Sequence, residues 1–461
     1  MGPESYSVWR REQSWLCGKA QVHAIRHAPP LIQNVRHLLS ARRFLPLFST
    51  QFLGAFNDSL FKQAVVLFVT YQLYSNPAKE FQFSAIAQAL FILPFFLFSA
   101  LSGQLADDHD KARLIRIIKF VEIGIMLVGG AGIVLANVPL MLAAVFAMGV
   151  HSTFFGPIKY AILPQHLNKD EVLGGTGLVE AGTYIAILLG TILAGVLAPR
   201  PQSAAVAVLV FALLGYLAGR QVPPAPPAAE RLPITWHIVN ASIELVSATM
   251  RIRRLFLAIL AISFFWTIGA VMIIIFPPLV KNVLGANEQV ASMFIAIFSI
   301  GIAIGSIAIN RMLKSQVSAR FAPPSVIAMG IFVLLLHFVS LTWGKHGEEL
   351  TTLGNFLFNP MAWPMILCLL GVAITGGMFV VPLYAFLTTT VPKTETARTV
   401  AANNIVNSGA MVIGALLAYA LSSLGIGPVG QLLLVAAMCL VSAWLGWKLH
   451  QACDEDLCRV V

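Results

Sequence analysis

Long apolar stretches separated by short polar turns dominate the chain. A membrane-spanning helix needs about 20 mostly apolar residues, and twelve stretches reach that length. They lie near residues 44–73, 83–106, 114–136, 138–165, 173–197, 203–219, 255–280, 287–310, 322–342, 361–390, 394–421 and 428–448. Between the sixth and the seventh lies the polar, proline-rich stretch RQVPPAPPAAERLPITWH. The pattern predicts an all-α membrane protein with twelve transmembrane helices in two six-helix bundles.

This pattern divides the chain into five segments. They are a basic N-terminal extension, a first bundle, a linker, a second bundle and a tail, at residues 1–43, 44–219, 220–254, 255–448 and 449–461. Near the end of the extension, Ile32, Val35, Leu38 and Leu39 share one helical face, opposite Arg36, Arg42 and Arg43. A short helix lying on the inner membrane surface is expected there.

The composition supports the membrane assignment. Hydrophobic residues make up 58% of the chain and charged residues 11%, whereas soluble domains carry about 25% charged residues. The formal net charge is +10, but the charges lie between apolar stretches rather than on one face. They therefore report orientation and do not indicate nucleic-acid binding.

Lys and Arg residues are distributed unevenly between the two sets of loops. The loops on one side hold Lys79, Arg200, Lys281 and Lys345, and most of the others lie in the termini, the linker and the opposite loops. Cytoplasmic loops carry the excess of Lys and Arg. Both termini and the linker of this multi-pass membrane protein are therefore expected in the cytoplasm.

The two halves echo each other. GPIKYAIL at 156–163 recurs as VPLYAFL at 381–387, and GLVEAG at 177–182 recurs as NIVNSG at 404–409. Parallel repeats of six spans resemble the two halves of major facilitator transporters, which bind substrate between them.

The loop after the second span also resembles a signature of that superfamily. In GQLADDHDKAR, a glycine precedes an acidic residue and then basic residues, at Gly103, Asp107, Lys111 and Arg113. Gly103 is expected to allow close helix approach, and Asp107 to meet a helix terminus or an arginine. A role in gating is expected, and the alternative is a solvated cytoplasmic turn.

Charged residues inside the spans are the candidates for substrate binding, because a charge at the bilayer centre costs about 2.5–3.5 kcal/mol on insertion scales. Asp58 and Lys62 lie four residues apart in QFLGAFNDSLFK, so they are neighbours on a helix. They either neutralise each other or face an aqueous cavity with Asn57. Glu122, one turn from Lys119, is expected to form a structural pair.

Two further charges lie in the fourth and fifth spans. Lys159 lies between Pro157 and Pro164, which bend the helix, and its point charge suits a phosphate group. Glu180 lies in EAGTYIAILLG, where small residues permit tight packing. An ion pair between Glu180 and Lys159 is the structural alternative to a binding role.

The second half has no such deep charges in the spans assigned here. It offers the polar side chains of Tyr384, Asn404 and Asn407 among many apolar residues. A charged head group could therefore bind the first half and an apolar group the second, which suggests an amphiphilic substrate.

Five motifs resemble one bacterial family. QFLGAFNDSLFK, GPIKYAILPQ, GLVEAGTYIAILLG, GGMFVVPLYAFL and NNIVNSGAM are similar to the lysophospholipid transporters of the major facilitator superfamily and to transporter domains fused to lysophospholipid acyltransferases. The resemblance implies transport of lysophospholipids, mainly lysophosphatidylethanolamine, to the inner leaflet for re-acylation by a cytoplasmic acyltransferase or acyl-ACP synthetase. It implies binding roles for Asp58, Lys159 and Glu180.

Two departures accompany the resemblance. Stand-alone members carry an arginine in the seventh span, near Ile273 here, and an apolar residue where this chain has Lys62. A proton-coupled exporter of drugs or polar solutes, with Glu180 or Asp58 carrying the proton, stays open as an alternative, as does a non-transporting scaffold. No phosphate loop, nucleophile motif or metal cluster is recognised, so neither an enzyme nor a cofactor is expected.

Overall fold

The computed structural model describes residues 37–168, 171–227, 238–313, 320–344, 349–389 and 396–458. Regular structure in these segments is helical apart from one isolated β-bridge, and twelve helices are long and apolar enough to cross a membrane. The predicted fold class is confirmed. The expected surface helix near residue 35 lies mostly outside the described residues, which begin at His37.

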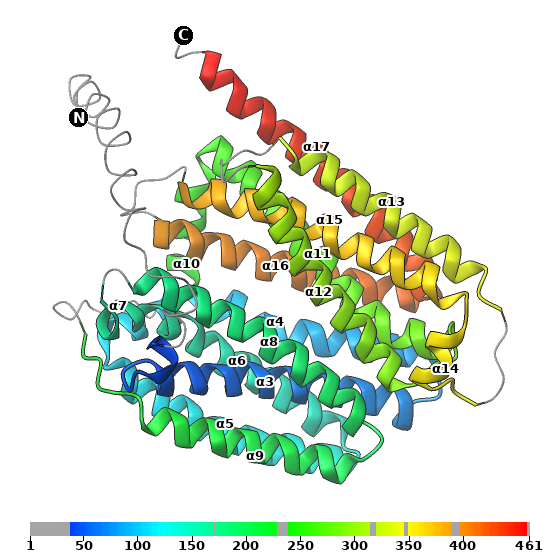
Figure 1. The fold of residues 1–461 in the computed structure, drawn as a ribbon, viewed down its shortest axis with the longest axis horizontal. Coiled ribbons are helices and arrows are strands. Elements are labelled where there is room, and N and C mark those ends of the chain that lie inside the picture. The colour runs from blue at the N-terminus through cyan, green and yellow to red at the C-terminus, as the bar shows by residue number, and fades with distance from the viewer. Residues whose placement is uncertain are drawn as a thin grey trace.

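Six spans form the N-terminal bundle, in the lower half of Figure 1. They comprise α3 (Leu45–Phe68) with the π-helical turn η1 (Val69–Leu73), α4 (Pro77–Asp108), α5 (Lys111–Val134), α6 (Val138–Ala161) with α7 (Leu163–His166), α8 (Val172–Leu197) and α9 (Pro201–Arg220). Within this bundle α3 packs on α8 and α9, and α6 packs on α4 and α5.

The C-terminal bundle repeats this arrangement. It comprises α11 (Arg253–Asn282), α12 (Glu288–Met312), α13 (Ala322–Leu341), α15 (Ala362–Thr389), α16 (Thr396–Ser423) and α17 (Pro428–Cys458), with the short α14 (Leu353–Phe358) before α15. The helix α10 (Ile238–Met250) lies in the stretch expected to be a linker. The bundles meet where α4 packs on α16 and α11, and α8 on α12.

Local sequence signals explain where the spans begin. Asn76, Asp110, Asn137 and Asn287 precede α4, α5, α6 and α12, and each side chain accepts hydrogen bonds from backbone amides of the first turn. Such caps satisfy donors that a helix leaves unpaired at its start. Large apolar side chains such as Phe120 and Leu440 face outward, as lipid contact requires.

The fourth span is interrupted beside Lys159, as the prolines predict. α6 contains Pro157 and ends at Ala161, and α7 restarts with Pro164 in its first turn. A proline inside a helix removes one backbone hydrogen bond and bends the helix. The break therefore lies next to a candidate binding residue.

Glycines bring α8 close to α3, as expected for the fifth span. A Cβ on Gly190 would lie 2.4 Å from the carbonyl oxygen of Phe56, and one on Gly182 would lie 2.7 Å from the Phe48 ring. The expectation for Gly103 was wrong in this conformation, because no heavy atom lies within 4 Å of its Cβ position.

Candidate substrate-binding site

Asp58 is half-buried in the middle of α3 and is bonded to α6. The hydroxyl group of Ser152 donates a hydrogen bond of 2.5 Å to its Oδ2 atom. Its Oδ1 atom accepts no hydrogen bond from the described part of the chain. Asp58 therefore has one buried acceptor oxygen that no donor of the described chain satisfies.

Lys62 does not form a direct ion pair with Asp58, which was one of the two alternatives that the sequence left open. The two remain within electrostatic reach, but no ion pair within 4 Å joins them in the described structure. Instead, Lys62 Nζ donates to Gln88 Oε1 of α4 at 3.4 Å and lies 4.8 Å from the centre of the Phe91 ring. The side chain thus points from α3 toward α4.

Lys159 carries a positive charge that no carboxylate neutralises by direct contact. Its Nζ lies 4.7 Å from the ring centre of Tyr160, and no residue of the described chain forms an ion pair or hydrogen bond with it. The alternative of an ion pair with Glu180 is wrong for this conformation, because Tyr160 donates its hydroxyl hydrogen bond to that carboxylate. Lys159 still interacts electrostatically with Glu180 and Asp58.

Asn57 lies apart from these groups, in a buried cluster. Its side chain is fully buried and donates to Glu122 Oε1 at 2.8 Å. Lys119 donates to the Oε2 atom of Glu122 at 2.7 Å, and His151 Nε2 lies 3.3 Å from the same atom. The structure thus forms the expected pair of Lys119 and Glu122, and it places Asn57 with that pair.

The C-terminal bundle contributes a cluster of aromatic and amide side chains. The hydroxyl group of Tyr384 accepts hydrogen bonds from Trp266 Nε1 at 2.7 Å and from Asn407 Nδ2 at 3.4 Å. Ser263 donates to Asn407 Oδ1 at 2.7 Å. Tyr384 also interacts electrostatically with Glu180 of the other bundle, so this group faces the charged one across the interface.

Two further residues of the C-terminal bundle bear on the prediction of the site: Asn404, which was predicted to belong to it, and Trp266, which was not. Asn404 is exposed one turn before Asn407 and forms no side-chain hydrogen bond in the described structure. Trp266 was not predicted as a site residue, since an aromatic side chain in an apolar span carries no distinctive signal. Its indole nitrogen, which needs an acceptor when buried, is the property that could have singled it out.

An apolar groove of about 580 Å³ lies where α4 of the N-terminal bundle meets α10 and α16, and none of the predicted site residues in the described part of the chain lines it. It is lined by Phe96 and Leu97 of α4, Val246 of α10, and Ile405, Gly409 and Ile413 of α16. Cavities of this size are typical of small-molecule sites. The cavity is apolar and adjoins Asn404 and Asn407 through α16.

The residues predicted to gate the transporter lie in the last turns of α4 and the first turn of α5, on either side of the short turn at His109 and Asp110. Lys111 is buried and Arg113 is exposed, while the side chain of Asp107 lies outside the described residues. Asp110, which the signature did not single out, accepts hydrogen bonds from the amides of Ala112 at 2.8 Å and Arg113 at 3.1 Å. The loop is therefore organised by a helix cap at its end.

Two six-helix bundles with ionisable groups at their interface define a multi-pass membrane transporter. The sequence profile of the Major Facilitator Superfamily matches residues 47–358, and the chain belongs to this superfamily.

Curated relatives confirm the resemblance noted in the motifs. The chain is 26% identical over 423 residues to the lysophospholipid transporter LplT of Citrobacter koseri, a match that covers 89% of this chain and 97% of the relative. It is also 26% identical to the lysophospholipid transporter LplT of Salmonella newport, over 81% of this chain and 86% of the relative.

Solved structures share the fold. The POT family transporter PepTSo superposes with a TM-score of 0.66 at 13% identity, over 89% of this chain and 98% of that one. A bacterial homologue of the lysosomal transporter Spinster superposes with a TM-score of 0.62 at 13% identity, over 89% and 98%. At such identities the likeness concerns the fold alone.

Proposed function

We propose that this protein moves lysophospholipids, with lysophosphatidylethanolamine as the principal substrate, across the bacterial inner membrane by alternating access. The observation that carries the proposal is the uncompensated ammonium group of Lys159, held near the acids Asp58 and Glu180 at the bundle interface. A zwitterionic head group supplies an anionic phosphate for the lysine and a cationic ammonium group for the acids. The LplT relatives support the same substrate class.

The head group binds the N-terminal bundle. Its phosphate replaces the missing partner of Lys159, and its ammonium group donates to the free Oδ1 atom of Asp58 or to Glu180. Lys62, held near Gln88, lies on the side of α3 that faces α4 and adds positive charge. These contacts replace hydration, because a polar group transferred into an apolar medium without hydrogen bonds costs several kcal/mol.

The single acyl chain lies in the apolar cavity between α4, α10 and α16. Its lining includes the exposed apolar side chains of Phe96, Leu97 and Ile413, so the acyl chain of a lipid that enters sideways stays in an apolar environment. Tyr384, Asn404 and Asn407 form the polar border on the C-terminal side. Rocking of the two bundles then carries the head group across the membrane.

The orientation follows from the distribution of Lys and Arg along the chain. With both termini and the linker in the cytoplasm, the substrate moves from the outer to the inner leaflet. A cytoplasmic acyltransferase or acyl-ACP synthetase then restores the second chain, and the transporter itself catalyses no reaction.

Reconstitution tests the proposal directly. Purified protein in vesicles should accelerate the flipping of fluorescent lysophosphatidylethanolamine over protein-free vesicles, while a diacyl phosphatidylethanolamine probe should not be accelerated. Equal rates with and without protein would overturn the substrate assignment. Transport of a small solute driven by a pH gradient, with no effect on lysolipid, would favour the proton-coupled exporter instead.

A further inference from the structure

Polar contacts between the two bundles gather at the end of the molecule where α4 begins and α11 ends. Tyr71 donates to the carbonyl oxygen of Asn287 at 3.4 Å, and Gln82 donates to Ser423 Oγ at 3.2 Å. Ser422 Oγ lies 3.5 Å from the carbonyl oxygen of Ala78. These contacts close the interface at this end, whereas the cavity at α10 lies toward the other end.

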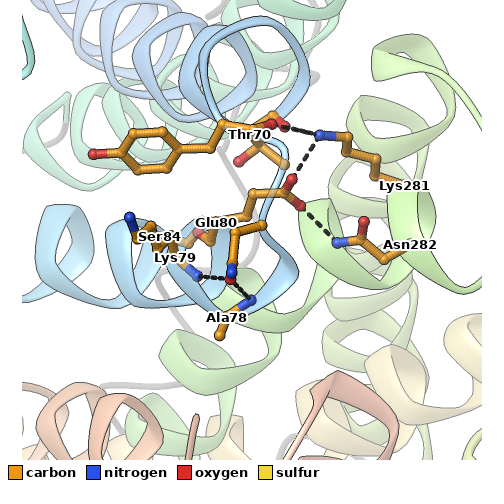
Figure 2. Close-up of polar contacts among 9 residues, drawn as sticks. Thr70, Ala78, Lys79, Glu80, Ser84, Lys281 and Asn282 are labelled. Carbon is orange, nitrogen blue, oxygen red and sulfur yellow. Dashed lines mark hydrogen bonds and ion pairs between the residues drawn. The ribbon is translucent and has the colours of Figure 1, made fainter. Parts of the chain in front are cut away.

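The strongest of these contacts involve a fully buried carboxylate. Glu80, in the first turn of α4, has no exposed surface. Figure 2 shows Lys281 and Asn282 of α11 reaching it from the other bundle. Lys281 Nζ lies 2.7 Å from Glu80 Oε1, and Asn282 Nδ2 donates to Oε2 at 2.6 Å. Both carboxylate oxygens are thus bonded to the C-terminal bundle.

Lys281 also binds the first span. Its Nζ donates to the carbonyl oxygen of Thr70 at 2.5 Å and to that of Tyr74 at 2.9 Å. These carbonyl groups lie at the π-helical turn η1, where Tyr74 N bonds to Val69 O. Such turns are rare and occur often at functional sites. An ammonium group has three hydrogens to donate, and here each has an acceptor.

Lys281 was predicted in an outer loop, and that expectation was wrong. The last turn of α11 extends past it to Asn282, and most of its side chain is buried against the N-terminal bundle. A buried ion pair is stable only while it is fully hydrogen-bonded, and removal of one partner leaves an uncompensated charge. Separation of the two bundles at this point therefore requires that water replace every one of these hydrogen bonds.

We propose that Glu80, Lys281 and Asn282 form a latch that holds this end closed and that must separate and hydrate before the bundles part here. By the distribution of Lys and Arg, this end faces outward, so the latch closes the outer entrance. The inference rests on alternating access, which is part of the proposed function, but its principal test needs no substrate.

Labelling of a cysteine at the interface measures the opening. The reporter is Ser422→Cys in a chain whose five native cysteines are replaced by serine, probed in spheroplasts with a membrane-impermeant maleimide. Ser422 is buried at the closed interface. Glu80→Gln keeps the shape of the side chain and removes the charge, so labelling should be about tenfold faster or more, as expected when a hydrogen bond to a charged group is lost.

Glu171→Gln provides the matched control. Glu171 is bonded to Arg43 at 2.6 Å within the N-terminal bundle, so this variant should label at the parental rate. An unchanged rate in Glu80→Gln, or equal acceleration in both variants, would overturn the latch. Either result leaves the lysolipid assignment untouched, because the measurement reads the opening of the interface and not transport.

A second experiment does not depend on how well Glu80→Gln folds. Glu80→Cys combined with Asn282→Cys is joined by a short bis-methanethiosulfonate reagent, which a reductant later removes. Lysophosphatidylethanolamine flipping should stop in the joined protein and return after reduction. Full flipping by the joined protein would show that this end need not open, and would overturn the proposal.

Discussion

Tyr160 donates its hydroxyl hydrogen bond to the carboxylate of Glu180, and the neighbouring Lys159 is left without a counter-ion in direct contact. Lys159 and Tyr160 follow each other on α6, beside the break before α7. Lys159 is half-buried, and a cation held partly out of water without a partner is favoured when a ligand neutralises it. The hydrogen bond from Tyr160 thus occupies the carboxylate of Glu180, and the ammonium group of Lys159 stays available to an anionic group of a ligand.

Lys159→Ala should slow lysolipid flipping in reconstituted vesicles by about 10- to 100-fold, which corresponds to the roughly 1.5–3 kcal/mol of a hydrogen bond to a charged group. The physical reason is the loss of the partner proposed for the substrate phosphate. Lys79→Ala, which removes an exposed lysine, should leave the rate unchanged. Undiminished flipping by Lys159→Ala would remove Lys159 from the binding site.

Tyr160→Phe tests whether the hydrogen bond from Tyr160 keeps Glu180 from pairing with Lys159. Without the hydroxyl group, Glu180 is free to bind the ammonium group of Lys159 and compete with the substrate. Flipping should therefore slow, and the double variant Tyr160→Phe with Glu180→Gln should recover part of the rate. A double variant no faster than the single one would mean that Tyr160 acts in another way.

Asp58→Asn should discriminate between head groups. The amide still accepts the hydrogen bond from Ser152 but has no charge for the ethanolamine ammonium group. Flipping of lysophosphatidylethanolamine should fall about 10-fold or more, while lysophosphatidylglycerol, which has no ammonium group, should be affected less. Equal losses for both lipids would argue against an ammonium contact at Asp58.

The spans could be predicted because a helix in lipid must satisfy its backbone internally, so length and hydropathy alone mark it. The hydrogen-bond partners of the polar side chains within the spans could not be predicted. Spacing on one helix made a pair of Asp58 and Lys62 one of two alternatives, but Ser152 and Gln88 on neighbouring helices form the hydrogen bonds with them. Such choices depend on the rotation of each helix about its axis, which hydropathy does not specify.

The same limit applies to polar residues that are adjacent in sequence to a candidate site residue. Asn57 follows Phe56 and precedes Asp58, yet it points to Glu122 on α5 rather than to Lys159. Adjacent residues on a helix differ by about 100° in direction. A polar residue next to a site residue is therefore a weak indication of a shared role.

The buried pair of Lys119 and Glu122 should contribute to stability rather than to transport. Lys119→Met leaves the Glu122 carboxylate uncompensated and should destabilise the protein by about 3–5 kcal/mol. The double variant Lys119→Met with Glu122→Leu should recover much of this loss. Thermal unfolding in detergent, followed by tryptophan fluorescence, measures both effects.

Arg43→Met serves as the comparison for the buried pair. It breaks a partly exposed ion pair with Glu171, and such pairs contribute about 0–1 kcal/mol. Its midpoint of unfolding should stay near that of the parent. A Lys119→Met protein as stable as Arg43→Met would show that the buried cluster tolerates the loss of its cation.

Gly190→Ala should loosen the contact between α3 and α8, the helices that carry Asp58 and Glu180. The added methyl group would lie 2.4 Å from the carbonyl oxygen of Phe56, and overpacking of this kind costs about 1–3 kcal/mol. Gly103→Ala is the matched control, because its Cβ position is open and alanine favours the helix by about 0.5–1 kcal/mol. The unfolding midpoint should fall for Gly190→Ala and hold or rise for Gly103→Ala. If both variants unfold alike, the close approach of α3 to α8 does not limit stability, and the positions of Asp58 and Glu180 depend on other contacts.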